Sequence, residues 1–157
     1  MERVVIRGRG GAGKSTLAAA LGTATGLPVI ELDEHFWGPD LEATPPDRWA
    51  VVQGELANTD RWIMDGDLGP YDVLDVRLRR ADTVLLLDHS FPGCAWRALL
   101  RSRERADFWL WVWSWRRRHR PLLINAIAAH AGHATLHVLR NPRATARFVA
   151  RELTRRT

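Results

Sequence analysis

Short apolar runs alternate with longer segments of helix-forming residues along this chain. The runs at 3–7, 28–32, 61–65, 82–88 and 134–139 combine β-branched and large apolar side chains, and each is followed or closed by a residue that favours a turn. The run at 82–88 is apolar along its whole middle, which is typical of a strand covered on both faces. We predict that these five runs are strands.

Helical segments separate the predicted strands. A first helix should run to Gly26, which is followed shortly by Pro28 as a stop signal. A second helix should start with Thr44 as its N-cap and Pro45 in its first turn. The remaining helical sequence covers about 92–131, with a break near Ala106, and roughly 142–153.

This alternation predicts an α/β fold. Right-handed βαβ crossovers place helices on both faces of a mostly parallel sheet, which is a three-layer α/β/α architecture with five strands. The chain has 157 residues and shows no internal repeat, linker or composition shift, so we expect one domain over residues 1–157. In such a fold ligands bind at the carboxyl ends of the strands.

Residues 8–16, GRGGAGKST, fit the pattern G-x-x-x-x-G-K-[ST] and stand between the first predicted strand and the first helix. Backbone N–H groups of such a turn and the start of the helix attract phosphates. Lys14 is the one lysine among 23 lysine and arginine residues, and its slim ammonium fits inside a closed loop where a planar guanidinium does not. The predicted nucleotide-binding residues are Gly8, Gly10, Gly11, Ala12, Gly13, Lys14, Ser15 and Thr16, with Lys14 on the β- and γ-phosphates and Ser15 on Mg²⁺.

Carboxylates at predicted strand ends offer the remaining chemistry. Asp65 and Asp88 each end a strand and are the candidates for Mg²⁺, and Asp65 is favoured if the third strand lies beside the first. Asp33 closes the second predicted strand, where it would accept a proton from an attacking hydroxyl or merely hold a turn. His35 and Trp37 are candidates for the acceptor wall.

Composition adds limits on partners and compartment. The net charge of +5 fits either a solvated basic surface or a nucleic-acid partner, and we do not favour the latter. Cys94 is the only cysteine, which suits a reducing compartment. The most apolar stretch, 108–115, is far below the roughly 18 residues of a membrane span. We therefore expect a cytoplasmic protein without membrane contact, as a monomer or a homodimer.

Several segments together resemble a known family. GRGGAGKST, GLPVIELDEHFW, RWIMDGD, RADTVLLLD and the closing VLRNPRATARFV look like the FlaR-like, topology-modulation group of P-loop proteins, relatives of adenylate kinase. The likeness runs from about residue 3 to 153. It implies an ATP-binding fold with strand order 2-3-1-4-5 and phosphoryl transfer to a small acceptor.

The resemblance also implies roles for particular residues. Arg97 and Arg101 match a pattern that places one guanidinium by the adenine and the next, a catalytic one, on the phosphates; their spacing of four puts both on one helical face. Asp65 and Gly66 resemble the acceptor-side DG of these kinases. Arg77 matches an arginine that could bind an acceptor phosphate or pair with a carboxylate. Asn141 and Pro142 would flank the adenine.

Two features depart from the group. Asp67 stands where the group usually has asparagine, which adds negative charge beside a phosphate site. The lid-like helical segment, about 103–120, is shorter than expected, and lid closure excludes water in such enzymes.

Aromatic and basic residues fill the segment after 108. Four tryptophans would form two adjacent helical stripes that suit a core, an acceptor wall or an oligomer contact: Trp109, Trp111, Trp113 and Trp115. The RRRHR run, 116–120, suits a solvated helix end or lid charge for the phosphates. A metal site at His130, His133 and His137 is not favoured.

The leading hypothesis is a kinase that uses ATP, or GTP, with Mg²⁺ and phosphorylates a nucleotide, nucleoside or other small metabolite. Its catalytic residues would be Lys14, Asp33, Arg97 and Arg101. The alternative is a nucleotide-binding regulatory module with slow or no hydrolysis that acts on DNA or a protein partner.

Overall fold

The computed structural model describes residues 1–38, 40, 42–68, 72–90, 94 and 106–155, with side chains of the last segment from 113 onward. The described strands form one all-parallel sheet of five strands in the order β2-β3-β1-β4-β5, as predicted. Their bounds are β1 Arg3–Gly8, β2 Val29–Glu31, β3 Trp62–Asp65, β4 Thr83–Leu87 and β5 Thr135–Leu139. The helices are α1 Lys14–Thr25, α2 Leu32–Phe36, α3 Pro46–Ala57, α4 Leu74–Leu78, α6 Ala106–His130 and α7 Pro142–Thr154.

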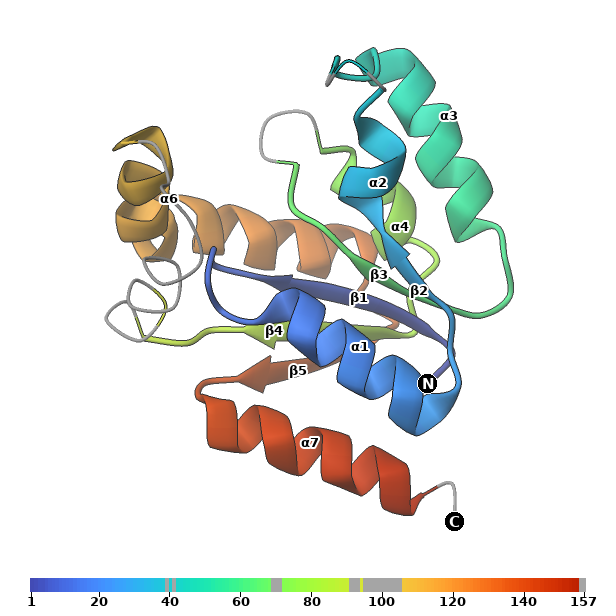
Figure 1. Ribbon diagram of the computed structural model, residues 1–157, viewed down its shortest axis with the longest axis vertical. Coiled ribbons are helices and arrows are strands. Elements are labelled where there is room, and N and C mark those ends of the chain that lie inside the picture. Colours follow the sequence, from blue (N-terminus) through green and yellow to red (C-terminus); the bar gives the residue numbers. More distant parts are fainter. Residues whose placement is uncertain (39, 41, 69–71, 91–93, 95–105, 156–157) are drawn as a thin grey trace.

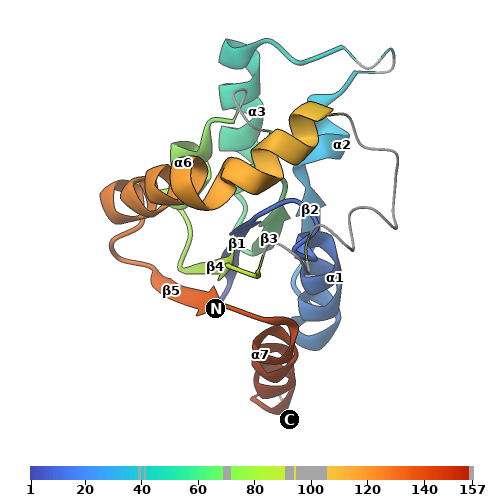
Figure 2. The same ribbon diagram turned by 90° about the vertical axis from the view of Figure 1, so that its left-hand side faces the viewer.

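Helices cover both faces of the sheet, as Figures 1 and 2 show. On one face α1 and α7 pack through Leu17, Leu21 and Phe148 against β-strand residues such as Ile6 and Leu85. The other face carries a second core that joins α3, α4 and α6 to the sheet through Trp49, Leu78, Trp115, Met64 and Val84. Both faces of the central strands are buried, which explains the consecutive apolar residues 4–6 in β1 and 84–87 in β4.

The register of the central strands sets where their ends meet. Ile6 of β1 lies beside Asp65 of β3, and Gly8 of β1 lies beside Leu87 of β4. The loop after β1 therefore emerges between Asp65 on one side and the end of β4 on the other. The neighbours of β1 are β3 on one side and β4 on the other, so the order of the strands reverses direction at β1. The end of β1 is therefore the switch point of the sheet, where ligands bind in α/β folds.

The prediction for Thr44 was wrong. α3 begins at Pro46 with Pro45 as its N-cap residue, and no side chain caps it. The hydroxyl and the N–H of Thr44 instead both donate to the carbonyl of Phe36, at 2.6 and 3.1 Å. Thr44 therefore ties the start of α3 back to the end of α2.

Two short helices were not predicted. α2 begins at Leu32, so Asp33 lies in a helix after β2 rather than at the end of the strand. α4 follows the segment after β3. Each has five residues, which is too short to show a helical repeat of apolar positions, and such helices depend on packing rather than on propensity.

Candidate active site

The loop between β1 and α1 makes a tight turn with a left-handed backbone at two glycines. Gly11 and Gly13 have φ of 71° and 92°, the left-handed region that glycine adopts without strain. The N–H of Ala12 donates to the carbonyl of Arg9 at 3.1 Å and closes the turn. α1 begins at Lys14 without a capping side chain, so its first N–H groups and its dipole face the loop.

Gly8 is required by contact with β4. A Cβ built on Gly8 would lie 2.7 Å from the carbonyl oxygen of Leu87 and 2.9 Å from its Cβ. The chain can leave β1 at this point and turn over the end of β4 only without a side chain. The glycine at 8 thus serves packing of the loop on the sheet.

Lys14 joins the loop to a group of carboxylates. Its Nζ donates to the carbonyl of Gly8 at 3.2 Å. Burial lowers the pKa of Lys14, while the carboxylates of Asp67 and Asp65 act in the opposite direction and favour the ammonium. The lysine predicted to hold phosphates therefore lies within electrostatic reach of the predicted metal ligand.

Asp65 fits Mg²⁺ better than Asp88 does. Asp65 is buried at the end of β3, and its Oδ1 has no hydrogen-bond partner among the described residues. Asp88 is also buried and its Oδ1 likewise lacks a hydrogen bond among the described residues, but its carboxylate is held in ion pairs with the Nε atoms of Arg120 at 3.1 Å and Arg116 at 3.6 Å. A buried carboxylate oxygen without a partner is costly, and Mg²⁺ prefers oxygen ligands of this kind. The residues present thus fit the metal that the fold implies.

Asp33, the predicted acceptor-side residue, lies within electrostatic reach of this group. It is exposed on α2, yet desolvation of its carboxyl by surrounding protein atoms raises its pKa. The nearby carboxylates of Asp65 and Asp67 raise that pKa further, and Lys14 lowers it. A carboxylate with a raised pKa is a better proton acceptor than an ordinary one.

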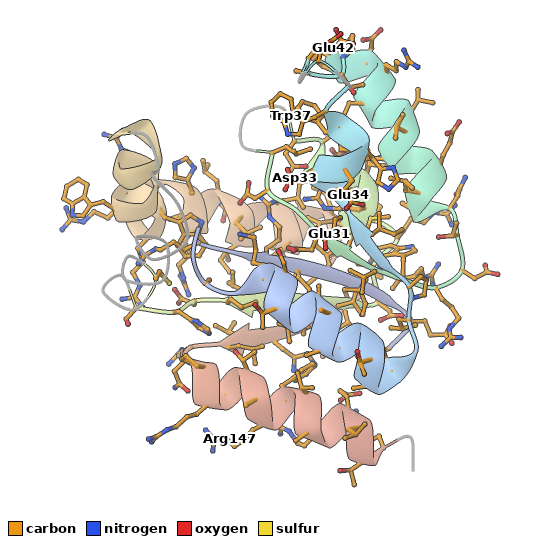
Figure 3. All side chains as sticks on the ribbon, in the orientation of Figure 1. Glu31, Asp33, Glu34, Trp37, Glu42 and Arg147 are labelled. Carbon is orange, nitrogen blue, oxygen red and sulfur yellow. The ribbon has the colours of Figure 1, made fainter. Side chains whose placement is uncertain are left out.

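Trp37, but not His35, shares a side of α2 with Asp33. Figure 3 shows Asp33 and Trp37 on the same side of the helix, and the N–H of Trp37 donates to the carbonyl of Asp33 at 3.4 Å. His35 is two residues from Asp33, a spacing at which helical side chains do not face each other. The structure therefore brings one of the two predicted wall residues next to Asp33.

A buried ion network joins β1 to the residues after β3, and the sequence did not identify Arg7 as part of it. Arg7 donates through Nη1 to Asp72 Oδ2 at 2.7 Å and to the Gly66 carbonyl at 2.9 Å, and its Nη2 lies 3.1 Å from Asp67 Oδ1. The signal in the sequence was an arginine directly after Val4-Val5-Ile6 in a buried strand, which requires a charged partner.

Arg77 belongs to the same network. Its guanidinium is fully buried and donates to Asp72 Oδ1 at 2.6 Å and to Gln53 Oε1 at 2.9 Å. Of the two roles considered for Arg77, the structure therefore shows pairing with a carboxylate. Binding of an acceptor phosphate would require this buried network to open. The Gly66 carbonyl accepts from Arg77 Nη2 at 3.3 Å as well as from Arg7, so both arginines hold the turn after β3.

The other side of the loop carries a cationic and aromatic cluster. The guanidinium of Arg9 lies 5.5 Å from the ring centroid of Trp115, and burial lowers its pKa. Arg116 and Arg120, from the predicted lid segment, pair with Asp88 at the end of β4. The carboxylate of Asp88 thus links basic residues of α6 to the end of β4, beside the loop that follows β1.

The tryptophan run divides between core and surface. Trp115 is 2% exposed and belongs to the core, whereas Trp113 is 62% exposed. The side chains of Trp109 and Trp111 lie outside the described residues, as do Arg97, Arg101 and the first part of the predicted lid, 103–105.

Asn141 and Pro142 start α7. The side-chain oxygen of Asn141 accepts from the N–H of Ala144 at 2.9 Å and caps the helix, with Pro142 in the first turn. His89, after β4, hydrogen-bonds Thr145 in the same turn at 3.3 Å. The amide NH₂ of Asn141 is not needed for the cap, so the predicted adenine contact is compatible with this geometry.

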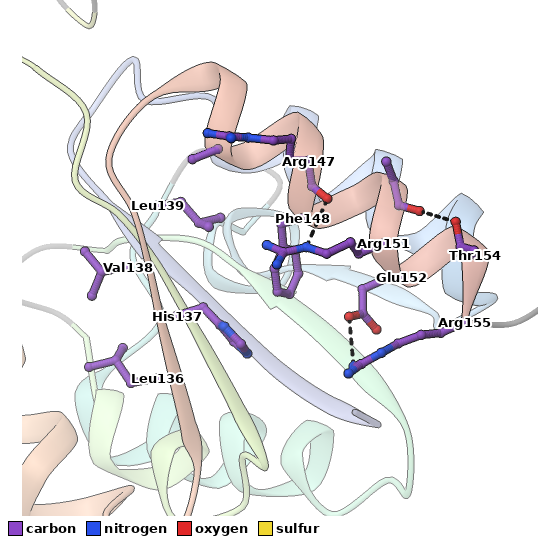
Figure 4. Close-up of a pocket in the computed structure, with 12 residues that line it drawn as sticks. Leu136, His137, Val138, Leu139, Arg147, Phe148, Arg151, Glu152, Thr154 and Arg155 are labelled. Carbon is purple, nitrogen blue, oxygen red and sulfur yellow. Dashed lines mark hydrogen bonds and ion pairs between the residues drawn. The ribbon is translucent and has the colours of Figure 1, made fainter.

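A separate groove of about 910 Å³ runs between β5 and α7. Figure 4 shows the residues that line this groove. The ring centroids of His137 and Phe148 are 4.9 Å apart, and Glu152 forms an ion pair with Arg155 at 3.2 Å. Its lining residues come from β5, from α7 and from the C-cap residue Arg155, and none belongs to the loop between β1 and α1. Among the described residues no three histidine, cysteine or acidic side chains group as metal ligands, so His130, His133 and His137 do not form such a site.

Comparison with known proteins supports the fold. The sheet order and layers match those of P-loop kinases. A shikimate kinase from Acinetobacter baumannii superposes with a TM-score of 0.68 at 17% identity, over 98% of this chain and 92% of that one. A sugar kinase from a Janibacter species gives 0.58 at 22% identity, over 98% and 93%. A deoxyadenosine kinase from M. mycoides gives 0.55 at 12% identity, over 98% and 100%.

No family model and no curated protein matches the sequence of this chain. The fold is therefore that of the P-loop kinases, and the resemblance to the FlaR-like group stays a prediction. None of the described helices is both long and apolar enough to cross a bilayer.

Proposed function

We propose that this protein is an ATP- and Mg²⁺-dependent phosphotransferase that acts on a small acceptor. The observation that carries the proposal is the meeting of Lys14, Asp65 and Asp33 at the switch point of the sheet, within electrostatic reach of one another. The structural similarity to kinases of shikimate, sugars and deoxyadenosine supports it. GTP is the alternative phosphoryl donor.

Each residue then has a chemical task. Lys14 and the loop N–H groups bind the β- and γ-phosphates, and Ser15 and Asp65 would hold Mg²⁺, which supplies charge neutralisation when bound. Asp33 accepts the proton of the acceptor hydroxyl. The acceptor oxygen forms a bond to the γ-phosphorus, the bond from that phosphorus to the bridging oxygen breaks, and ADP leaves. Arg97 and Arg101 are proposed to stabilise the charge of the transferring group.

The finer assignment rests on the motifs quoted above. We propose that the chain belongs to the FlaR-like, adenylate-kinase-related group and forms one domain with a short lid over 103–120, and that it acts in the cytoplasm. Asn141 and Pro142 are proposed to flank the adenine, and Gly66 to face the acceptor. Photo-crosslinking of 8-azido-ATP would test the adenine contact, because labelled peptides should come from the segment around 141.

The test of the proposed function combines binding and transfer. Calorimetry with MgATP should detect binding that is lost in Lys14→Ala and is not restored in Lys14→Arg, because the planar guanidinium does not fit the closed loop. Asp33→Asn should retain binding but lose transfer by about 10²-fold or more, the scale of general-base catalysis. Failure of the folded wild type to bind MgATP or MgGTP would refute the proposal.

One observation favours the second candidate, a nucleotide-binding module that contacts nucleic acid. Four exposed arginines follow one another at intervals of four along α7, so they form one basic stripe: Arg143, Arg147, Arg151 and Arg155. Such a stripe would bind phosphates with strong salt dependence. Retention of duplex DNA that falls steeply between about 50 and 200 mM salt would support this candidate, and no retention at low salt would exclude it.

A further inference from the structure

The acceptor side of the site has an acidic balance of charge. Three carboxylates, those of Asp65, Asp67 and Asp72, lie within electrostatic reach of Asp33 there, and Lys14 is the cation that acts on Asp33 most strongly. Under the proposed function, on which this inference rests, Lys14 binds the phosphates of the donor and Asp65 binds the metal. Asp33 then faces the acceptor as an unneutralised carboxylate.

The two guanidinium groups that the described residues place in this region are already engaged by carboxylates. Arg7 pairs with Asp67 and Asp72, and Arg77 pairs with Asp72. The two side chains are 10% and 0% exposed. A phosphate or carboxylate on the acceptor would have to displace one of these buried pairs before it could bind a guanidinium, and it would also meet Asp33 and Asp67. An anionic acceptor is therefore repelled rather than recognised.

An exposed aromatic ring completes this surface. Trp37 is 42% exposed and lies on the same side of α2 as Asp33. One side of its ring is held by Phe36, with centroids 4.8 Å apart in a T-shaped contact, and Phe36 packs in the same way on buried Trp49 at 5.2 Å. The contact with Phe36 thus holds the Trp37 ring in place, and the exposed part of the ring presents apolar surface to solvent, which suits stacking of a ring-shaped ligand.

We propose that the acceptor is a cyclic hydroxyl compound without phosphate or carboxylate, such as a neutral or amino sugar or a nucleoside. Trp37 stacks on its ring, and Asp33 accepts the proton of the hydroxyl that becomes phosphorylated. Asp67, held by Arg7, keeps anionic acceptors out. Nucleoside monophosphates and sugar acids are therefore poor substrates.

The experiment uses the full chain with MgATP and acceptors in matched pairs that differ by one anionic group. The pairs are adenosine and AMP, ribose and ribose 5-phosphate, and glucose and glucuronate, with glucosamine as a cationic member. Product formation is measured by mass spectrometry, and binding by thermal shift with MgADP present. The uncharged or cationic member of the responding pair should have a kcat/KM at least about tenfold higher than the anionic one.

Variants test the two residues that carry the inference. Asp67→Asn removes a negative charge and releases one contact of Arg7, so the preference should move toward the anionic member by about tenfold. Asp75→Asn, which removes a carboxylate paired with Arg79 on the surface, should leave the preference unchanged. Trp37→Ala should raise KM for the neutral acceptor, and Trp37→Phe should restore most of the affinity.

The outcomes separate this inference from the proposed function. Preferred phosphorylation of the anionic members overturns the inference while the kinase assignment stands. If no neutral or cationic member responds in either assay, the inference is also overturned. In that case calorimetry with MgATP separates the two: binding leaves the proposed function standing, whereas no binding of MgATP or MgGTP refutes it as well.

Discussion

The guanidinium of Arg7 lies 3.1 Å from the carboxylate of Asp67, Nη2 to Oδ1, where β1 and the turn after β3 reach the site. In the resemblance to FlaR-like proteins, Asp67 replaced an asparagine and added negative charge beside a phosphate site. The ion pair fixes the position of the Asp67 carboxylate, because Arg7 is itself held by the Gly66 carbonyl and by Asp72. A residue inside the central strand therefore holds the turn after β3 in place.

Removal of Arg7 should be costly. Arg7→Met removes one ion-pair partner from Asp67 and one from Asp72, and breaking a buried ion pair from one side typically costs about 3–5 kcal/mol. Urea unfolding should show this loss in the free energy of unfolding. Arg79→Met is the matched control, because its pair with Asp75 has side chains 64% and 40% exposed and such pairs contribute about 1 kcal/mol or less. Equal losses in the two variants would contradict the prediction.

Asp72 should make the protein sensitive to acid. The guanidiniums of Arg77 and Arg7 overcome the effect of burial and lower the pKa of Asp72 to about 2 from 3.8. Since the folded pKa is depressed, the stabilisation is present above pH 3.8 and is lost as the pH falls from there toward 2. The contribution is on the order of 2 kcal/mol.

The variant Asp72→Asn tests this pH window. It should be less stable than the wild type at pH 6, and the gap should narrow as the pH falls below about 3.8, because the wild type then loses the charge that the variant lacks. Urea midpoints measured at several pH values give the two curves, and exposed Asp75→Asn controls for removal of a surface carboxylate. A gap that is constant from pH 6 to pH 2.5 would show that Asp72 does not act through its charge.

Gly8→Ala should disrupt the loop. The added Cβ would lie 2.7 Å from the backbone oxygen of Leu87 in β4, so the strand or the loop must shift. We expect a loss of about 1–3 kcal/mol, as for overpacking of a core, and weaker MgATP binding. Gly54→Ala has no atom within 4 Å of its Cβ and lies inside α3, so it should stabilise the protein by about 1 kcal/mol. Thermal unfolding of both variants measures these changes in stability. A Gly8→Ala variant as stable as the wild type would refute the packing argument.

Asn141 has a structural and a proposed binding task that substitution can separate. Asn141→Ala removes the cap of α7 and should cost about 1 kcal/mol, whereas Asn141→Ser keeps a capping oxygen and most of the stability. If the amide also contacts adenine, both variants should bind MgATP more weakly by calorimetry. If Asn141→Ser binds MgATP with wild-type affinity, Asn141 caps α7 and does not contact adenine.

The sequence by itself determined the layout of the chain. The five apolar runs became the five strands, and the glycine-rich loop lies between β1 and α1 as predicted. These features depend on neighbours in sequence, namely the spacing of apolar residues, the glycines that a tight turn requires and the stop signals at helix ends. The strand order followed from resemblance, and the structure confirmed it.

Only the tertiary structure decided which charges meet. Arg7 and Asp72 are 65 residues apart, and no local pattern pairs them. The same holds for Arg77, whose buried pair with Asp72 is one of the two roles that the sequence had left open. It also holds for Asp88, whose carboxylate pairs with Arg116 and Arg120, whereas no ion pair among the described residues engages Asp65. A buried charge must find its partner wherever the fold places one, so its role depends on strand order, register and the path of the loops rather than on adjacent residues.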